Sequence, residues 1–236
     1  MKKYKLTTET LQFAGRTLHR IKAVKDFDSI KAGEFGGWIE NEKNLSQDDN
    51  AWIYGDAMVF DNAEVYGNAS VFGNAEVYGN AEVYGNANVS DYANVFGNAE
   101  VYGNANVFGN ANVSGNANVS GNAEVYGNAN VSGNAEVYGN ANVSGNAEVY
   151  GNAVIKGDAK VHDAVDYIVF KNFWSSGRYF TWTSSNNKWS VGCFYGTGEE
   201  LIKKAYADSE KSGREYERVV RYVESILADE KKEKSN

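Results

Sequence analysis

The chain has 236 residues, of which 42% are hydrophobic; it has no proline and carries a formal net charge of −8. It is long enough for one sizeable core. The single cysteine, Cys193, excludes an intramolecular disulfide. No apolar run reaches the roughly 18 residues of a membrane-spanning helix or forms a signal peptide. We therefore expect a cytoplasmic protein with no membrane partner.

The charge is distributed unevenly along the chain. Residues 1–50 and 164–236 each carry a net charge of +1, whereas residues 51–163 hold two basic and twelve acidic residues, a net of −10. Because contacts to phosphate require cations, direct binding of nucleic acid by this central segment is disfavoured.

Residues 1–50 precede the regular part of the chain and are predicted to form a hairpin and an irregular capping segment. His19, in the run LHRIKAV, is placed on the surface of this hairpin. Ile39 and Leu45 are six residues apart, so an irregular first coil is expected to begin there. The segment would cover an open end whose unpaired backbone groups invite aggregation.

Residues 51–163 repeat with a period of six. From Ile53 to Val161 an aliphatic residue recurs at nineteen successive sixth positions without an insertion, in the unit V-[YFS]-G-N-A-[EN]. This period fits neither one helix nor one flat strand, and it predicts a short strand followed by a tight turn. Alternation points each valine inward and its two neighbours outward.

The corners of the repeat are predicted at the Gly-Asn pairs. Gly67 and Asn68 are expected to turn the chain, because these two residue types best tolerate positive φ. Ala69 is small enough to lie beneath the corner. Stacked repeats bury each other's apolar face and align Asn68 with Asn86 in a ladder.

The unit V-[YFS]-G-N-A-[EN] resembles that of the hexapeptide-repeat superfamily, whose fold is a left-handed parallel β-helix. The resemblance implies a three-sided coil of 18 residues, hence an all-β solenoid of about six coils at roughly 4.8 Å spacing. Residues 22–57 are also similar to the entry segment of bacterial and phage repeat proteins labelled polymer-forming or acyltransferase.

Residues 164–236 are predicted to form a small α+β module. Two strands, 178–183 and 188–194, flank the turn-rich residues 184–187 and read as a β-hairpin, with Cys193 inside the second strand. The module resembles one found at the end of some phage-encoded repeat proteins.

Two helices follow this hairpin. Capping boxes at residues 197–200 and 212–215 are each predicted to open one, and the tail from Asp229 is expected to fray. The second helix presents one apolar face, formed by Tyr216, Val219, Val220, Val223, Ile226 and Leu227.

Many hexapeptide-repeat proteins are acyltransferases, in which a histidine is the general base and the acyl donor lies in a groove between subunits. A loop protruding from a coil often shapes the pocket of such enzymes, and no insertion interrupts this repeat. The two histidines are His19 and His162, the latter expected on the outer side of the last coil near Asp163 and Asp166. A general base needs a partner and a pocket, so we interpret His162 as structural. It is the catalytic candidate only if the chain is an acyl-CoA-dependent acyltransferase or a degenerate relative of one.

The outward positions of the repeat gather acidic residues on one face. Four of the seven glutamates that precede a repeat valine fall there, each two residues before a tyrosine. We call these residues the Glu/Tyr strip: Glu64, Tyr66, Glu82, Tyr84, Glu100, Tyr102, Glu136 and Tyr138. Carboxylates stacked at this spacing repel by roughly 1 kcal/mol per pair in water.

Three interpretations of the Glu/Tyr strip stay open. Duplication of one unit explains it without any function. A protein with a basic surface would be attracted to it, with the tyrosine rings as flat anchors. A ladder of divalent cations is the third, although stacking rather than a chelating loop sets the glutamate spacing.

We therefore predict a non-catalytic acidic module that binds a protein or acts as a scaffold, without metal or cofactor. The end modules suggest a phage source and a host-directed interaction. Nucleic-acid mimicry is a sharper version, since ten acids over about 27 Å compare with one charge per roughly 1.7 Å of duplex DNA. An architectural spacer and a homo-oligomer also stay open.

Overall fold

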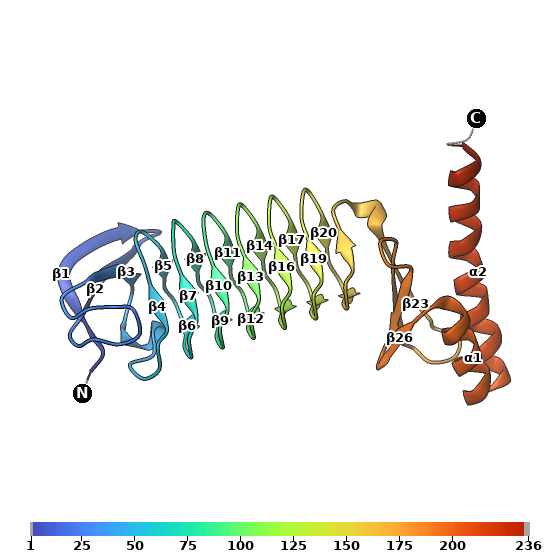
Figure 1. Cartoon of the computed structure of the whole chain (residues 1–236), viewed down its shortest axis with the longest axis horizontal. Helices are drawn as coiled ribbons and strands as arrows, with labels where there is room; N and C mark the ends of the chain where they lie inside the picture. The colour runs from blue at the N-terminus through green and yellow to red at the C-terminus, as the bar shows by residue number, and fades with distance from the viewer. Residues whose placement is uncertain (1, 234–236) are drawn as a thin grey trace. The chain divides into compact units, whose positions relative to one another are not determined.

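A computed structural model describes residues 2–233, with side chains described to Asp229. The chain divides into two compact units, Met1–Asp166 and Tyr167–Asn236. The first is a parallel β-solenoid and the second is a small α+β module (Figure 1). The predicted solenoid with 18 residues per coil is confirmed.

The solenoid has three faces, on which short strands 18 residues apart pair in parallel. Face 1 contains β3 (Phe35–Ile39), β5 (Met58–Val59), β8 (Glu76–Val77), β11 (Asn94–Val95), β14 (Asn112–Val113), β17 (Asn130–Val131) and β20 (Glu148–Val149). Face 2 contains β4 (Trp52–Ile53), β7 (Ser70–Val71), β10 (Asn88–Val89), β13 (Asn106–Val107), β16 (Glu124–Val125), β19 (Asn142–Val143) and β22 (Lys160–Val161). Face 3 contains β6 (Glu64–Val65), β9 (Glu82–Val83), β12 (Glu100–Val101), β15 (Asn118–Val119), β18 (Glu136–Val137) and β21 (Val154–Ile155).

The N-terminal residues form an antiparallel hairpin of β1 (Tyr4–Phe13) and β2 (Arg16–Ala23), which continues face 1. β2 pairs with β3, and β3 pairs in parallel with β5, so that Ile39 lies beside Val59. Leu45, after the short 3-10 helix η1 (Glu42–Asn44), forms a bridge to Val65. The irregular first coil predicted at Ile39 and Leu45 is thus confirmed, and it raises the number of coils to about seven.

The core of the solenoid consists of the inward valines and the alanines beneath the corners. From Ala51 to Val161 these side chains are at most 1% exposed. Each coil is joined to the next by backbone hydrogen bonds, such as that from Tyr84 N to Val101 O at 3.0 Å. Full burial of a valine stabilises the fold by about 1.5–3 kcal/mol relative to exposure, so the repeat supplies its own core.

Glycine alone takes the positive φ at the corners, as in Gly103 with φ +72. The prediction that asparagine shares this role is wrong. The asparagine side chains instead form the predicted ladder, in which Asn68 Nδ2 donates to Asn86 Oδ1 at 3.0 Å and Asn86 donates to Asn104 at 3.1 Å. Each amide thereby satisfies a neighbour one coil away.

Two aspartates replace glycine at corners. Asp61 and Asp91 have φ values of +59 and +60. Their carboxylates accept hydrogen bonds from the backbone N–H of the next coil, at Gly79 (3.3 Å) and Gly109 (3.1 Å). The hydrogen bond offsets part of the backbone strain.

A buried lysine closes the first end of the solenoid. Lys3 is 1% exposed, and its Nζ donates to the carbonyl oxygens of Ala51 at 2.8 Å and Asp48 at 3.0 Å. Burial lowers the pKa of Lys3 to about 8. The N-terminal segment therefore satisfies backbone groups that an open end would expose.

The second unit contains a four-stranded antiparallel sheet, formed by β23 (Tyr167–Lys171), β24 (Tyr179–Thr183), β25 (Lys188–Val191) and β26 (Phe194–Gly196). It follows the 3-10 helix η2 (Ala164–Asp166). The predicted hairpin is β24–β25. Its second strand ends earlier than predicted, because Gly192 with φ +56 begins a turn. Cys193 lies exposed in that turn, so its placement inside a strand is wrong.

Helices α1 (Gly198–Asp208) and α2 (Glu210–Glu233) pack on this sheet. Thr197 and Glu200 form the predicted capping box of α1. The second predicted box is wrong, because α2 already begins at Glu210 and Ser209 Oγ accepts from Ser212 N at 3.1 Å.

The predicted apolar face of α2 is confirmed, with Tyr216, Val220 and Val223 buried. The tail stays helical to Glu233 rather than fraying from Asp229 onward, and residues 234–236 lie outside the described part. Within the described residues, neither helix has the length and apolar character needed to cross a membrane.

Candidate binding surface on the solenoid

Face 3 brings the Glu/Tyr strip together. The register pairs Glu82 with Glu64 on one side and with Glu100 on the other. The valine between each glutamate and its tyrosine is buried, so both neighbours face outward. Glu136 and Tyr138 lie two coils beyond Glu100, after a coil that carries Asn118.

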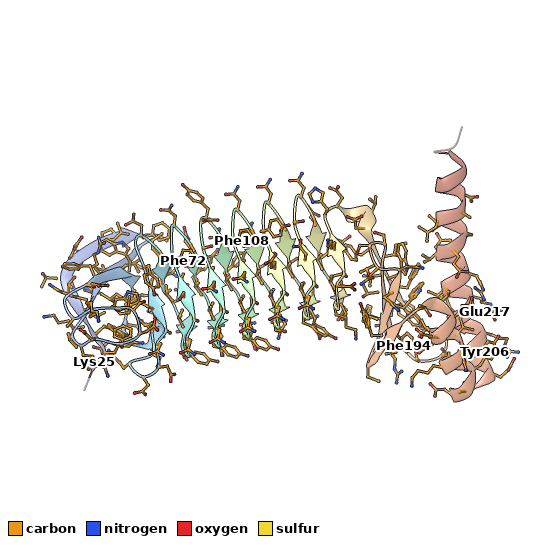
Figure 2. All side chains as sticks on the ribbon, viewed as in Figure 1. Lys25, Phe72, Phe108, Phe194, Tyr206 and Glu217 are labelled. Carbon is orange, nitrogen blue, oxygen red and sulfur yellow. The ribbon has the colours of Figure 1, made fainter. Side chains whose placement is uncertain are left out.

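The tyrosine rings of the strip stack along the rod. The ring centroids of Tyr66 and Tyr84 are 4.8 Å apart with an interplanar angle of 2°, and Tyr84 and Tyr102 are 4.9 Å apart. Aromatic columns also run along the other faces, as the pair Phe108–Tyr126 at 4.8 Å shows. Figure 2 labels Phe108 and Phe72, which occupy the same column of face 2.

Each of the first two phenols reaches a glutamate of the following coil. Tyr66 Oη donates to Glu82 Oε2 at 2.7 Å, and Tyr84 Oη donates to Glu100 Oε2 at 3.0 Å. Hydrogen bonds to a charged acceptor are stronger than neutral ones, so they offset the repulsion between stacked carboxylates. Sequence reasoning missed this contact, although a tyrosine two residues after a glutamate in an 18-residue coil implies it.

Burial raises the pKa values of Tyr66 and Tyr84 well above the ordinary 10, and the hydrogen bonds to Glu82 and Glu100 add to this. Above pH 10 the unfolded chain loses these protons while the folded chain keeps them. Since the folded state then binds more protons, its free energy of unfolding falls as pH rises.

We expect the stability of the wild type to decrease above about pH 10, measured as the urea midpoint at pH 7, 9 and 10.5. The variant Y66F/Y84F should lose about 1 kcal/mol per hydrogen bond at pH 7 and should show a weaker alkaline decrease. Y150F, at an exposed ring outside the strip, serves as the control. Parallel curves for wild type and double variant would contradict the assignment.

The histidines lie apart from the strip. His162 is exposed at the end of face 2, and its Nδ1 lies 3.3 Å from Ser144 Oγ. The Asp166 carboxylate accepts from the backbone N–H of His162 at 2.7 Å. His19 lies on β2, with Nδ1 3.4 Å from Thr7 O. In the described residues, no group of three or more His, Cys, Asp or Glu side chains could hold a metal ion.

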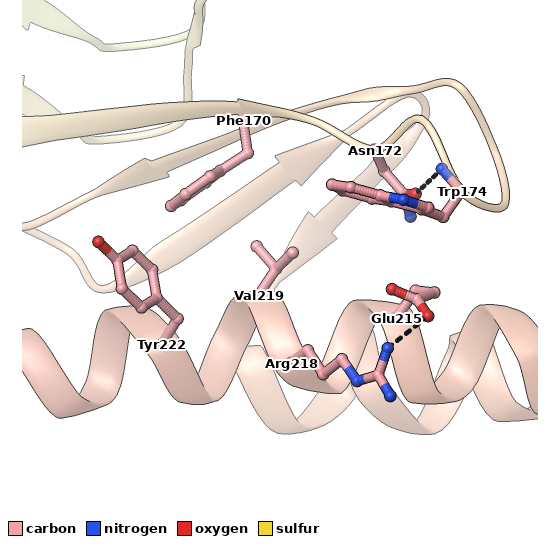
Figure 3. A pocket seen from close by; sticks show the side chains of 7 residues that line it. All are labelled: Phe170, Asn172, Trp174, Glu215, Arg218, Val219 and Tyr222. Atoms are coloured by element: carbon pink, nitrogen blue, oxygen red, sulfur yellow. Dashed lines mark hydrogen bonds and ion pairs between the residues drawn. The ribbon is translucent and has the colours of Figure 1, made fainter.

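The α+β module carries a groove that the sequence did not predict. Its volume is about 330 Å³, and it lies between β23, the following turn and α2 (Figure 3). Arg218 and Glu215 pair on its α2 side at 2.8 Å, and Trp174, 67% exposed, lies on the opposite side. The exposed Phe173-Trp174 pair was the available signal in the sequence.

The repeat and its coils are those of the hexapeptide-repeat class of parallel β-helix proteins. No family model matches the chain. The chain is similar to the "Uncharacterized acetyltransferase YdcK" of Escherichia coli (strain K12), with 39% identity over 62 residues, which are 23% of this chain and 19% of that protein. The chain therefore spans about a fifth of the length of this curated relative.

Proposed function

We propose that the protein is a non-catalytic binding module whose Glu/Tyr strip docks on a protein with a basic surface. The observation that carries this proposal is the fixed arrangement of the strip, in which stacked rings and phenol–carboxylate hydrogen bonds hold the side chains in place. A surface that is already ordered loses little conformational entropy on binding.

The charge of the rod supports the same proposal. Between Ala51 and Ile155 the chain holds ten acidic residues and no lysine or arginine. A basic partner would be steered to this surface by long-range attraction, which raises the association rate and weakens in salt. Tyrosine rings add flat contact area, and tyrosine is frequent among residues that dominate binding energy.

The test compares two variants of equal charge. E64Q/E82Q/E100Q/E136Q neutralises the strip, whereas D56N/E76Q/E124Q/E148Q removes four charges elsewhere on the solenoid. Titrated with an arginine-containing basic peptide at physiological salt, the strip variant should bind at least about tenfold more weakly than the control variant.

Equal losses in the two variants would contradict the proposal, because net charge alone would then explain binding. Circular dichroism and thermal unfolding should show both variants folded, since glutamine and asparagine fit outward positions. Nucleic-acid mimicry is a specific form of the proposal and predicts that binding weakens steeply as salt is raised.

Acetyl transfer is a second candidate, favoured by the name of the partial relative. On the solenoid, His162 is the histidine available as a general base, with Ser144 beside it. This candidate predicts acetyl-CoA turnover that H162A abolishes and H19A retains. Turnover unaffected by H162A would count against it.

A further inference from the structure

The tyrosine column of face 3 lacks one ring. Ser120 occupies the position between Tyr102 and Tyr138, because β15 pairs with β12 on one side and with β18 on the other. Two steps of 4.8–4.9 Å separate these tyrosines along the column, about 10 Å in all. A planar group midway would lie about 5 Å from each ring, within the range of stacking and cation–π contacts.

The same substitution removes a hydrogen-bond donor. Tyr66 and Tyr84 each donate to the glutamate of the next coil, and a tyrosine at position 120 would donate to Glu136 in the same way. Serine is too short for this contact. Glu136 therefore lies exposed on the strip without the phenol that Glu82 and Glu100 have.

The Ser120 side chain points into this gap from its base. It is 9% exposed, and its hydroxyl has no hydrogen-bond partner among the described residues. A buried polar group without a partner is costly, so a ligand that supplies one is favoured at this point.

Cations already stack on aromatic columns within this chain. Lys156 follows Tyr138 in the same column, is 8% exposed, and has its Nζ 5.6 Å from the Tyr138 ring centroid. At the start of the column on face 1, the Arg16 guanidinium lies 5.3 Å from the Phe60 ring and pairs with Asp61. The second case combines stacking with a carboxylate contact.

We propose that the gap at Ser120 receives an arginine side chain of the partner protein. The guanidinium is planar, stacks on aromatic faces and donates to carboxylates. It would therefore replace both contacts of the missing tyrosine, lying between Tyr102 and Tyr138 and donating to Glu136. This inference rests on the proposed function, because it names the anchor by which a basic partner engages the strip.

Face 2 provides a matched gap without acidic neighbours. Ser90 separates Phe72 from Phe108 in the column there. The residue that corresponds to Glu136 is Asn106, which accepts from Asn88 Nδ2 at 3.2 Å. Filling this second gap changes the shape of the rod without touching the Glu/Tyr strip.

The test uses two peptides of equal length and charge, one with five arginines and one with five lysines, titrated against the full chain by calorimetry. The arginine peptide should bind about tenfold more tightly than the lysine peptide. S120Y, which restores the residue found at positions 66, 84 and 102, should remove this difference. S90F should leave both affinities within about twofold of wild type.

Equal affinities for the two peptides in the wild type, or an arginine preference that survives S120Y, would overturn the inference. If E64Q/E82Q/E100Q/E136Q still loses binding in that case, the proposed function stands and only the insertion fails. If that variant binds like wild type, the proposed function itself fails. Tighter binding of a tyrosine-containing peptide would assign the gap to an aromatic ring instead.

Discussion

Deletion of residues 103–120, one complete coil, is expected to leave a folded solenoid, whereas deletion of Gly103 alone is expected to destabilise it strongly. The long deletion joins Tyr102 to Gly121 and restores the sequence V-Y-G-N-A. Every inward valine keeps its orientation, and each strand meets a partner of the same type. Solenoid stability is approximately a sum over neighbouring repeats, so the midpoint of unfolding should change little.

Loss of a single residue breaks the period of six. Every following coil must then shift in register, which would turn valines outward, or one corner must break and unpair its coil. Each valine left exposed costs about 1.5–3 kcal/mol, so a loss on the order of 5 kcal/mol and 10–20 °C is expected.

Circular dichroism and thermal unfolding measure both deletions. Comparable destabilisation by the two would contradict the account of the coil as the unit of stability. Removal of residues 103–120 also removes Ser120, so this variant should lose the preference for the arginine peptide while keeping the fold.

Replacement of Gly103 by alanine is the second change with a large expected effect. Gly103 has φ +72, and a Cβ there would lie 3.0 Å from Gly121 N and 3.1 Å from Gly121 O. The left-handed conformation costs a residue with a Cβ about 1–2 kcal/mol, and the backbone contact adds to this. We expect G103A to lower the free energy of unfolding by about 2–4 kcal/mol.

Two comparisons separate these causes. G15A has a similar φ of +77 with nothing within 4 Å of the added carbon, so it should lose only the conformational part. G103D should recover about 1 kcal/mol over G103A, because Asp61 and Asp91 accept the next coil's N–H from this position. Urea unfolding measures all three, and equal losses for G103A and G15A would show that the coil contact is unimportant.

The regular solenoid was predictable because its period is repeated without interruption. A buried valine every six residues fixes which side chains point inward, and glycine fixes where the corners lie. The roles within the corner were not separable by composition, since both Gly and Asn tolerate positive φ, and only the structure assigns the turn to glycine and the ladder to asparagine. The start of α2 was mispredicted because Ser209 and Ser212 both carry capping side chains.

The membership of the Glu/Tyr strip followed from counting in steps of 18, and its energetics did not. The phenol of Tyr66 reaches Glu82 in the next coil, so stacked carboxylates that looked only repulsive are partly compensated. The gap at Ser120 was likewise visible as a missing tyrosine. Its meaning depended on the stacking and on the burial of the serine, which are three-dimensional facts.

The native mass in solution, by light scattering on a sizing column, tests most directly whether the Glu/Tyr strip is free to bind a partner. We expect a mass near 25.9 kDa, with the strip accessible along the whole solenoid. A mass near 78 kDa, three times the chain mass, would contradict the account, because a trimer would create the groove between subunits that acyl transfer requires in the hexapeptide-repeat acyltransferases.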